Sequence, residues 1–266
     1  MTAVPSLDFL CTLAAEAGEI IARQRSQLDI QFKNGNELVT QADIAADTLI
    51  RERIMRAFPD HQILSEELAP DADTEHEHLW VIDPVDGTVN YAHLHPQVAI
   101  SIAYYRHGSA QLAVVHNPFL QETFSAGLGQ GAWLNGAGIH CSSTSDMKRA
   151  LIATGFPYQK DNLQPLMRRL QAVLSHCADI RRLGSAALDI CWVACGRLDG
   201  YYETVKPWDF AAAQLIAREA GAESGHIHQP PAGQNPELWG ENLLLANPAL
   251  YRPLRQLLQQ ADAGSL

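Results

Sequence analysis

The stretch WVIDPVDGTVNY, residues 80–91, places two acidic residues, a proline and a glycine directly after an apolar run. The apolar run predicts a buried strand, and Pro84 lacks the N–H that a continued ladder would need. We therefore expect the strand to end at Asp83 and the chain to turn. The carboxylates of Asp83 and Asp86 and the carbonyl of Val85 would then converge on one point. Hard oxygen donors of this kind suit Mg²⁺.

The next two residues, Gly87 and Thr88, precede a segment that can start a short helix. Backbone N–H groups at such a helix start favour anions, and a glycine lets a phosphate approach closely. A metal site and a phosphate site would therefore adjoin. The same letters also fit a plain Asx turn that caps a helix, and this alternative stays open for the stretch taken alone.

Other acidic residues stand where they could reach the same point. The sequence Ser65-Glu66-Glu67 ends the preceding predicted strand, and Asp209 follows Pro207 in the first turn of a later predicted helix. Taken singly, the glutamates also fit a solvated loop, and Asp209 also fits an ordinary helix start. The combination favours an oxygen-lined cation site.

Composition limits the class of protein. With 266 residues, of which 47% are hydrophobic and 18% charged, the chain can bury a sizeable core in one large domain or two intimate halves. Its apolar runs are too short to span a bilayer, and charged residues interrupt residues 1–25, so we expect a soluble protein without a cleaved signal or membrane contact. The net charge of −11 argues against direct nucleic-acid binding. Five cysteines without a CxxC pair indicate reduced thiols in a cytoplasm.

Periodicity predicts the order of the elements. Helical spacing predicts helices over 6–27, with Ser6 as N-cap, and from Thr40 to Pro59, with Asp43 in a capping box. Alternation predicts strands over 62–65, 79–83, 98–106 and 110–116, followed by a Gly-rich stretch at 127–138. For the remainder we predict strand 151–155, helix 161–176, strand 178–182, helix 185–195, strand 198–203, helix 207–221, strand 242–246 and helix 248–261. This interleaving predicts an α/β fold of sheets covered by helices.

Three motifs carry a resemblance to a known family. SEE at 65–67, DPVDGTVNY at 83–91 and WDFAAAQLIAREAGA at 208–222 resemble, in order and separation, the inositol monophosphatase family of Mg²⁺-dependent, Li⁺-sensitive phosphatases. Further likenesses, among them ATGFP at 153–157 and GSAALD at 184–189, extend over nearly the whole chain. The resemblance implies an αβαβα sandwich formed by one domain, 1–266, with an N-terminal α+β half (1–148) carrying the metal and phosphate motif and a C-terminal α/β half (149–266).

The resemblance also implies a ligand set for two or three Mg²⁺ ions. Glu67, Asp83 and the Val85 carbonyl would hold the first ion, and Asp83, Asp86 and Asp209 the second. A third, weaker ion would lie near Glu67 through waters.

The family's catalytic and phosphate-binding roles carry over in the same way. Gly87 and Thr88 would donate backbone N–H groups to the phosphate. Asp43 would accept a hydrogen bond from the Thr88 hydroxyl, and this pair, together with Glu67, would orient and deprotonate an attacking water without a phosphoenzyme. Lys33 would approach the phosphate from a loop, or lie in solvent.

The pocket for the leaving alcohol is less well defined. Asp86, Asp209, Glu203 and the segment Gly184, Ser185 and Ala186 would contact the substrate by resemblance. From Glu203 to Asp209 the chain takes six steps (209 − 203), one fewer than usual in the family, and lacks the usual glycine. The position of Glu203 therefore stays open. The residue after Thr88, Val89, resembles the inositol or fructose-bisphosphate branches.

The function predicted first is a phosphomonoesterase that hydrolyses inositol monophosphate, with a small phosphorylated polyol or sugar as substrate and a homodimer as assembly. The alternatives are a fructose-1,6-bisphosphatase, a broader sugar-phosphate or nucleotide phosphatase, and a binding role in a transcription complex, in addition to catalysis or instead of it. The histidine pairs at 76 and 78, 93 and 95, and 226 and 228 fit chance spacing better than a metal site.

Overall fold

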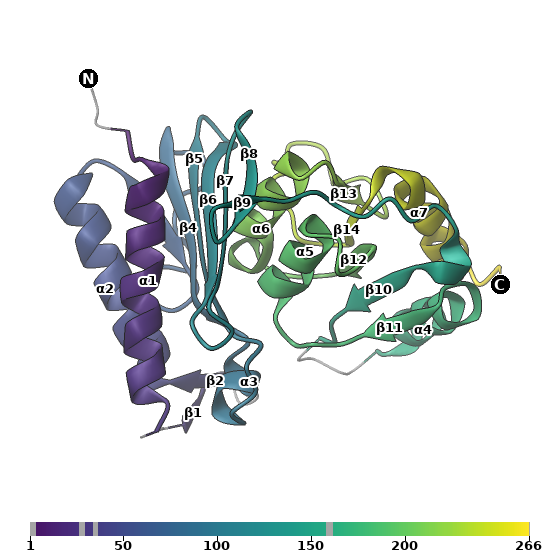
Figure 1. Ribbon diagram of the computed structural model, residues 1–266, viewed down its shortest axis with the longest axis horizontal. Helices are drawn as coiled ribbons and strands as arrows, with labels where there is room; N and C mark the ends of the chain where they lie inside the picture. The colour runs from purple at the N-terminus through teal and green to yellow at the C-terminus, as the bar shows by residue number, and fades with distance from the viewer. Residues whose placement is uncertain (1–3, 27–29, 34–36, 158–161, 266) are drawn as a thin grey trace.

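Two large sheets and three layers of helices alternate along the long axis of the molecule (Figure 1). The computed structural model describes residues 4–26, 30–33, 37–157 and 162–265. From the N-terminal side, the layers are a helix pair, a seven-stranded sheet, a second helix pair, a five-stranded sheet and a third helix pair. The predicted αβαβα sandwich is confirmed.

The first layer contains α1 (Leu7–Gln24) and α2 (Gln41–Ala57), which pack together on one face of the seven-stranded sheet. Ser6 accepts the N–H of Phe9 as the predicted N-cap of α1. The predicted capping box of Thr40 and Asp43 opens α2. Between the helices, β1 (Ile30–Lys33) pairs with β2 (Glu37–Thr40) in a hairpin that the sequence did not predict.

The seven-stranded sheet has the order β3-β4-β5-β6-β7-β8-β9. Only the β3–β4 pair among these is parallel. The strands are β3 (Gln62–Ser65), β4 (His78–Asp86), β5 (Ala99–Arg106), β6 (Ser109–Asn117), β7 (Glu122–Gly127), β8 (Gly131–Leu134) and β9 (Ala137–Gly138). The sequence did not predict β7, and β8 and β9 occupy the stretch predicted only as Gly-rich.

One prediction about β4 is wrong. The ladder to β5 does not stop at Asp83, because Asp83 pairs with Ser101 and Asp86 still pairs with Ala99. Three steps on β4 face two on β5, so the strand bulges over the intervening residues. Pro84 lies inside this bulge, where the ladder needs no N–H from it, and bulges of this kind re-aim side chains beside functional sites.

The other layers follow the predicted alternation. The middle layer contains α5 (Ala186–Ala194) and α6 (Pro207–Glu219), and the outer layer contains α4 (Gln164–His176) and α7 (Pro248–Asp262). The five-stranded sheet has the order β11-β10-β12-β14-β13, formed by β10 (Leu151–Thr154), β11 (Asp179–Arg181), β12 (Gly200–Glu203), β13 (Glu223–His226) and β14 (Leu243–Ala246). The short helices are α3 (Thr88–Ala92) and η1 (Met147–Arg149). Of these elements, β13 and η1 were not predicted.

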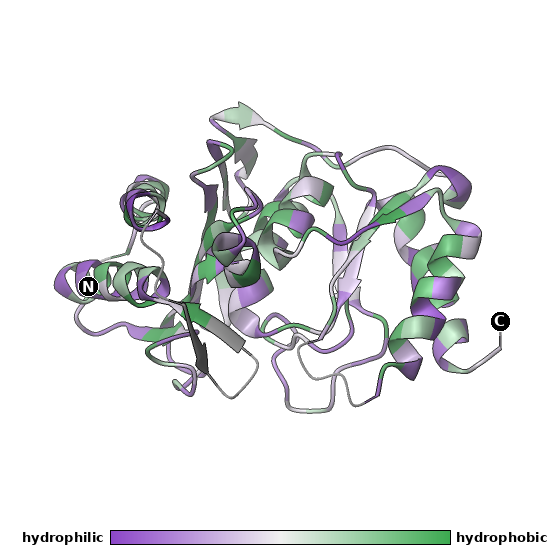
Figure 2. Cartoon of the chain, turned by 90° about the horizontal axis from the view of Figure 1, so that it is seen from below, coloured by the Kyte–Doolittle hydropathy of each residue, from purple (hydrophilic) through white to green (hydrophobic). Residues whose placement is uncertain are grey.

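The middle layer is apolar on both faces. All residues of α6 from Phe210 to Ala217 are buried, and α6 contacts strands of both sheets. In Figure 2 the central helices are largely green, whereas the outer helices mix purple and green. Because one core spans both sheets, we propose that 1–266 form one domain. No helix in the described part of the chain has the length and apolarity to cross a membrane, and all five cysteines are free thiols.

Candidate functional site

The bulge of β4 presents two buried carboxylates. Asp83 is 1% exposed and Asp86 is 7% exposed. The Val85 N–H donates to Asp83 Oδ1 at 2.9 Å, which fixes the turn of the bulge. Burial raises the pKa of the Asp83 carboxyl well above its usual range, and the charges of Glu66, Asp86 and Asp209 raise it further. The two carboxylates predicted from the motif therefore lie in one low-dielectric cluster.

Asp86 joins the two halves of the chain. Its Oδ2 accepts the hydroxyl of Ser185 at 2.5 Å and the backbone N–H of Ala187 at 2.8 Å, both at the start of α5. These donors offset part of the cost of burial, which nonetheless raises the pKa of Asp86 to about 6. The structure thus brings the segment around Ser185 to Asp86, as the resemblance implied.

Asp209 reaches the cluster from the first turn of α6. Pro207 occupies the first position of the helix, as predicted, and Asp209 Oδ2 accepts the N–H of Lys206 at 2.7 Å. Ser101 of β5 donates to the carbonyl of Trp208 at 3.2 Å, which anchors this turn beside the bulge. Burial and then the charge of Glu66 raise the pKa of Asp209 well above its usual range.

The charges of the two glutamates after β3 act most strongly on different groups of acids. The Glu66 N–H donates to the Ile82 carbonyl at 3.2 Å, next to Asp83. The charge of Glu66 raises the pKa of Asp83, Asp86 and Asp209.

The charge of Glu67 raises the pKa of Asp43 and Asp47 on α2, and the charge of Glu66 adds a smaller increase at Asp43. Ser65, the residue before Glu66, donates to Asp47 on α2, whereas the Glu66 N–H donates to Ile82 of β4, the residue directly before Asp83. The placement favours Glu66 over the predicted Glu67 as the ligand beside Asp83.

The predicted hydrogen bond between Thr88 and Asp43 is present. Thr88 Oγ1 lies 3.2 Å from Asp43 Oδ1 and 3.1 Å from the Val85 carbonyl, so a single hydroxyl proton faces two acceptors. The other oxygen of Asp43 accepts the N–H of Thr40 at 3.0 Å. Burial raises the pKa of Asp43 to about 7, so this carboxyl changes protonation near neutral pH.

Gly87 has a conformation that only glycine adopts readily. Its φ is +93°, and a Cβ there would lie 2.8 Å from the carbonyl oxygen of Gln97 and 3.1 Å from that of Gly184. The five-residue helix α3 follows at once, as predicted. Gly87 therefore lets the end of β4, the start of α3 and the Gly184 segment meet without a side chain between them.

Glu203 remains within the site despite the shortened segment. Its side-chain oxygens lie 2.0 Å from the position that a Cβ would take on Gly155, so the missing side chain of Gly155 makes room for them. Tyr201 donates to Glu203 Oε2 at 2.6 Å. Burial raises the pKa of Glu203 to about 7, and the charge of Asp86 adds to this. Sequence reasoning noted the ATGFP motif but missed this role of its glycine.

Lys33 is the last residue of the strand β1, not part of the loop in which the sequence placed it, and its side chain is outside the described ones. The histidines lie away from the acid cluster. His78 shares a hydrogen bond with the Tyr104 hydroxyl at 2.6 Å, and the ring nitrogens of His226 and His228 contact Trp239 and Asp262.

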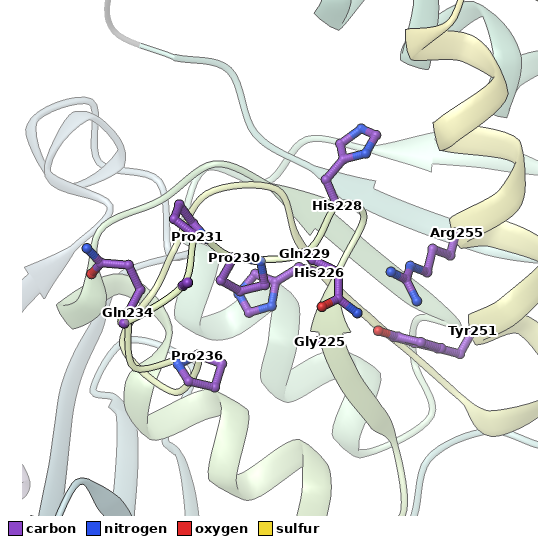
Figure 3. A pocket seen from close by; sticks show the side chains of 12 residues that line it. Gly225, His226, His228, Gln229, Pro230, Pro231, Gln234, Pro236, Tyr251 and Arg255 are labelled. Atoms are coloured by element: carbon purple, nitrogen blue, oxygen red, sulfur yellow. The ribbon is translucent and has the colours of Figure 1, made fainter.

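A cavity of about 440 Å³ lies between β13, the loop after it and α7. Figure 3 shows Tyr251 and Arg255 reaching it from α7. None of the clustered acids lines this cavity, so it is not the site described above.

The acid cluster has the chemistry of a cation site without a preassembled geometry. Among the described residues, no Lys, Arg or His forms an ion pair with Asp83, Asp86 or Asp209. Nor do three His, Cys, Asp or Glu side chains in that part of the chain meet closely enough to hold a metal. Each of the three carboxylates accepts a backbone N–H, from Val85, Ala187 and Lys206 respectively. Since oxygen donors that lack a counter-charge suit a divalent cation, the donor set fits Mg²⁺.

The raised pKa values predict how stability depends on pH. Asp86, Asp43 and Glu203 titrate at about 6, 7 and 7 when folded, against roughly 4 when unfolded. The folded state holds these protons longer, so their stabilisation is complete below about pH 4 and disappears as the pH rises through 6 to 7. In chelator, the melting temperature should fall by about 5 °C between pH 5 and pH 8. Mg²⁺ should reduce this fall, and a melting temperature that is flat or rises in chelator would contradict the cluster.

Comparisons with known proteins agree over nearly the full length of the chain. A family model described as "Inositol monophosphatase family" matches residues 4–262. The protein named Nus factor SuhB from Escherichia coli K12 is 38% identical over 255 residues, which cover 94% of each chain. The inositol monophosphatase from Anabaena is 34% identical with a TM-score of 0.82, covering 96% of this chain and 95% of that one. The inositol monophosphate-bound SaIMPase-II is 27% identical with a TM-score of 0.81, covering 97% and 96%.

Proposed function

This chain belongs to the inositol monophosphatase family, and on that premise we propose that it is a Mg²⁺-dependent phosphomonoesterase that hydrolyses inositol monophosphate. The observation that carries the proposal is that Asp83, Asp86, Asp209 and Glu66, from three separate segments, lie close enough for the charge of Glu66 to raise the pKa of all three aspartates. A protein that only binds partners has no need to gather four acids around two buried carboxylates.

The proposed metal ligands differ from the predicted set in one residue. Glu66, Asp83 and the Val85 carbonyl would hold one ion, and Asp83, Asp86 and Asp209 a second. Glu67, whose charge is felt at Asp43, would stay near the water-mediated third ion. When bound, Mg²⁺ supplies charge neutralisation for the phosphate and lowers the pKa of water.

The chain's own groups would place the water and the phosphate. Asp43 accepts a hydrogen bond from the Thr88 hydroxyl, so the Thr88 oxygen can accept a hydrogen bond from an attacking water and orient it. The backbone N–H groups of Gly87 and Thr88 would bind the phosphate. As the water oxygen bonds to phosphorus, the water's proton would pass to Thr88 while the Thr88 proton moves to Asp43. The ester P–O bond breaks, the leaving alkoxide takes a proton from a solvent water, and Asp43 returns its proton to solvent. Lys33 would approach the same phosphate.

The polyol would lie between the start of α5 and the end of β12. Glu203 accepts from Tyr201 and keeps a second oxygen for a substrate hydroxyl. Gly184, Ser185 and Ala186 would line the opposite side, next to Asp86. Support for a polyol comes from the solved relative that binds inositol monophosphate.

The test is phosphate release from a panel of esters. Inositol 1-phosphate should be hydrolysed faster than fructose 1,6-bisphosphate, 3′-phosphoadenosine 5′-phosphate or histidinol phosphate, with Mg²⁺ present. Chelator should abolish the release. A higher kcat/KM for fructose 1,6-bisphosphate would select the alternative sugar-phosphate activity, and undiminished release in chelator would exclude the metal mechanism.

A second candidate is a role in transcription, which the name of the relatives, Nus factor SuhB, favours. It does not require the carboxylates. If a transcription reaction responds equally to the wild type and to Asp86→Asn, the role is independent of catalysis. We also propose a homodimer, for which light scattering of the purified chain is the direct measurement.

A further inference from the structure

We propose that Arg25 is a positioning residue that holds α3, and with it Thr88, in place for the reaction. The inference rests on the proposed function for its effect on activity. Arg25 lies just after α1, as its C-cap, 63 residues before Thr88 (88 − 25). Neither the motifs nor the implied ligand set includes it.

Arg25 binds three backbone carbonyls at the far end of α3. Its Nε donates to the Tyr91 carbonyl at 3.3 Å, and its Nη2 donates to the Asn90 carbonyl at 3.2 Å and to the His95 carbonyl. The carbonyls of Asn90 and Tyr91 also accept the N–H groups of His95 and Leu94, at 2.9 and 3.3 Å. Arg25 adds a charged donor at this end of α3, where a cation complements the helix dipole. Arg25 therefore caps α3 from another element.

Two aromatic rings contact the Arg25 guanidinium in addition to the backbone carbonyls. Its central carbon lies 4.0 Å from the ring centroid of Phe119 and 5.4 Å from that of Tyr91. The Tyr91 hydroxyl donates to the Ile21 carbonyl of α1 at 2.7 Å, a second tie between the two helices. A planar, permanently charged group with several donors suits this arrangement, and an ammonium cannot reproduce it.

The helix α3, which Arg25 holds, carries residues that contact two separate parts of the proposed site. A five-residue helix has too few internal bonds to be stable alone. Thr88 is its first residue and contacts Asp43. Asn90 donates through one side-chain nitrogen to the carbonyls of Gln97 and Leu183, at 2.8 and 2.7 Å.

Leu183 lies two residues before Ser185, whose hydroxyl donates to Asp86. A shift of α3 would thus displace both the Thr88 hydroxyl and the segment that supports Asp86. Such a shift should lower kcat more than it changes KM, because the chemical step depends on the alignment of the reacting groups.

The experiment compares Arg25→Ala, Arg25→Lys and a control, Arg53→Ala, in the full chain. Arg53 pairs with Glu16 between α1 and α2 at an exposed site, so it matches Arg25 in charge and helix contact but lies away from α3. With inositol 1-phosphate, Arg25→Ala should lower kcat by about 10- to 100-fold, with a change in KM of about 3-fold or less. Arg25→Lys should recover less than half of the loss, and Arg53→Ala should keep the wild-type kcat.

Amide hydrogen exchange supplies a readout that does not depend on activity. Arg25→Ala should speed exchange at residues 88–95 and leave the strands β5 and β6 at the wild-type rate. An unchanged kcat, or unchanged exchange at 88–95, would overturn the proposal, as would a general rise in exchange over the sheet. If Arg25→Ala does not fold, kcat and amide exchange measured on Arg25→Lys test the proposal. A wild type without phosphatase activity would refute the proposed function, but amide exchange at residues 88–95 would still show whether Arg25 stabilises α3.

Discussion

Asp86→Asn should lower kcat by about 10³-fold or more, which corresponds to about 4 kcal/mol of lost transition-state stabilisation. The substitution removes one charge from the proposed second ion site while keeping an oxygen that can accept the Ser185 hydroxyl or the Ala187 N–H. Phosphate release from inositol 1-phosphate at saturating Mg²⁺ is the measurement. Asp60→Asn, at an exposed position, is the matched control and should keep the wild-type rate.

The same variant should have the opposite effect on the stability of the metal-free protein. Burial and neighbouring charge disfavour the ionised form of Asp86, whose pKa is raised to about 6. A neutral Asn removes that repulsion, so the melting temperature in chelator at pH 8 should equal or exceed that of the wild type. A folded variant with near-normal activity would refute the site, and a melting temperature far below the wild type would mean that Asp86 acts through the fold.

The pair Glu66→Gln and Glu67→Gln tests the one ligand that the structure reassigns. Glu66→Gln should lower kcat by about 10²-fold or more, because Glu66 shares its electrostatic surroundings with Asp83 and Asp209. Glu67→Gln should lose at least about 10-fold less, since its charge is felt at Asp43 and Asp47.

The two variants control for each other, being adjacent and identical in chemistry. Kinetics should therefore be measured over a Mg²⁺ titration. Glu66→Gln should raise the Mg²⁺ concentration needed for half-maximal rate, and Glu67→Gln should leave it within about 3-fold. The reverse order of the two effects would restore Glu67 as the ligand beside Asp83.

Most helices and strands could be predicted because their signals are local. The capping box of α2, the proline at the start of α6 and the apolar periods all act within a few residues. The hairpin β1–β2 and the strands β7, β8, β9 and β13 were missed because they are short and most of them are rich in glycine or polar residues. Such strands gain their stability from a neighbouring strand that the local sequence does not reveal.

The bulge at Pro84 shows why a local rule failed. Pro84 cannot donate to a ladder, so a strand end was a sound expectation from the sequence. Only the pairing with β5 decides that the ladder resumes at Asp86. The sequence predicted that a turn brings Asp83 and Asp86 together. In the structure, a bulge within a continuing strand does so.

The sequence by itself determined the α/β layering, the acidic motif and the identity of most acids around the site, because these follow from period, spacing and side-chain chemistry. Tertiary structure placed the charge of Glu66 near Asp83, Asp86 and Asp209, because the turn after β3 is hydrogen-bonded to β4 next to Asp83. It also decided that Ser185 supports Asp86 and that Arg25 holds α3. These contacts join residues 99 and 65 to 70 positions apart, and the packing of the layers, which no local pattern encodes, brings them together.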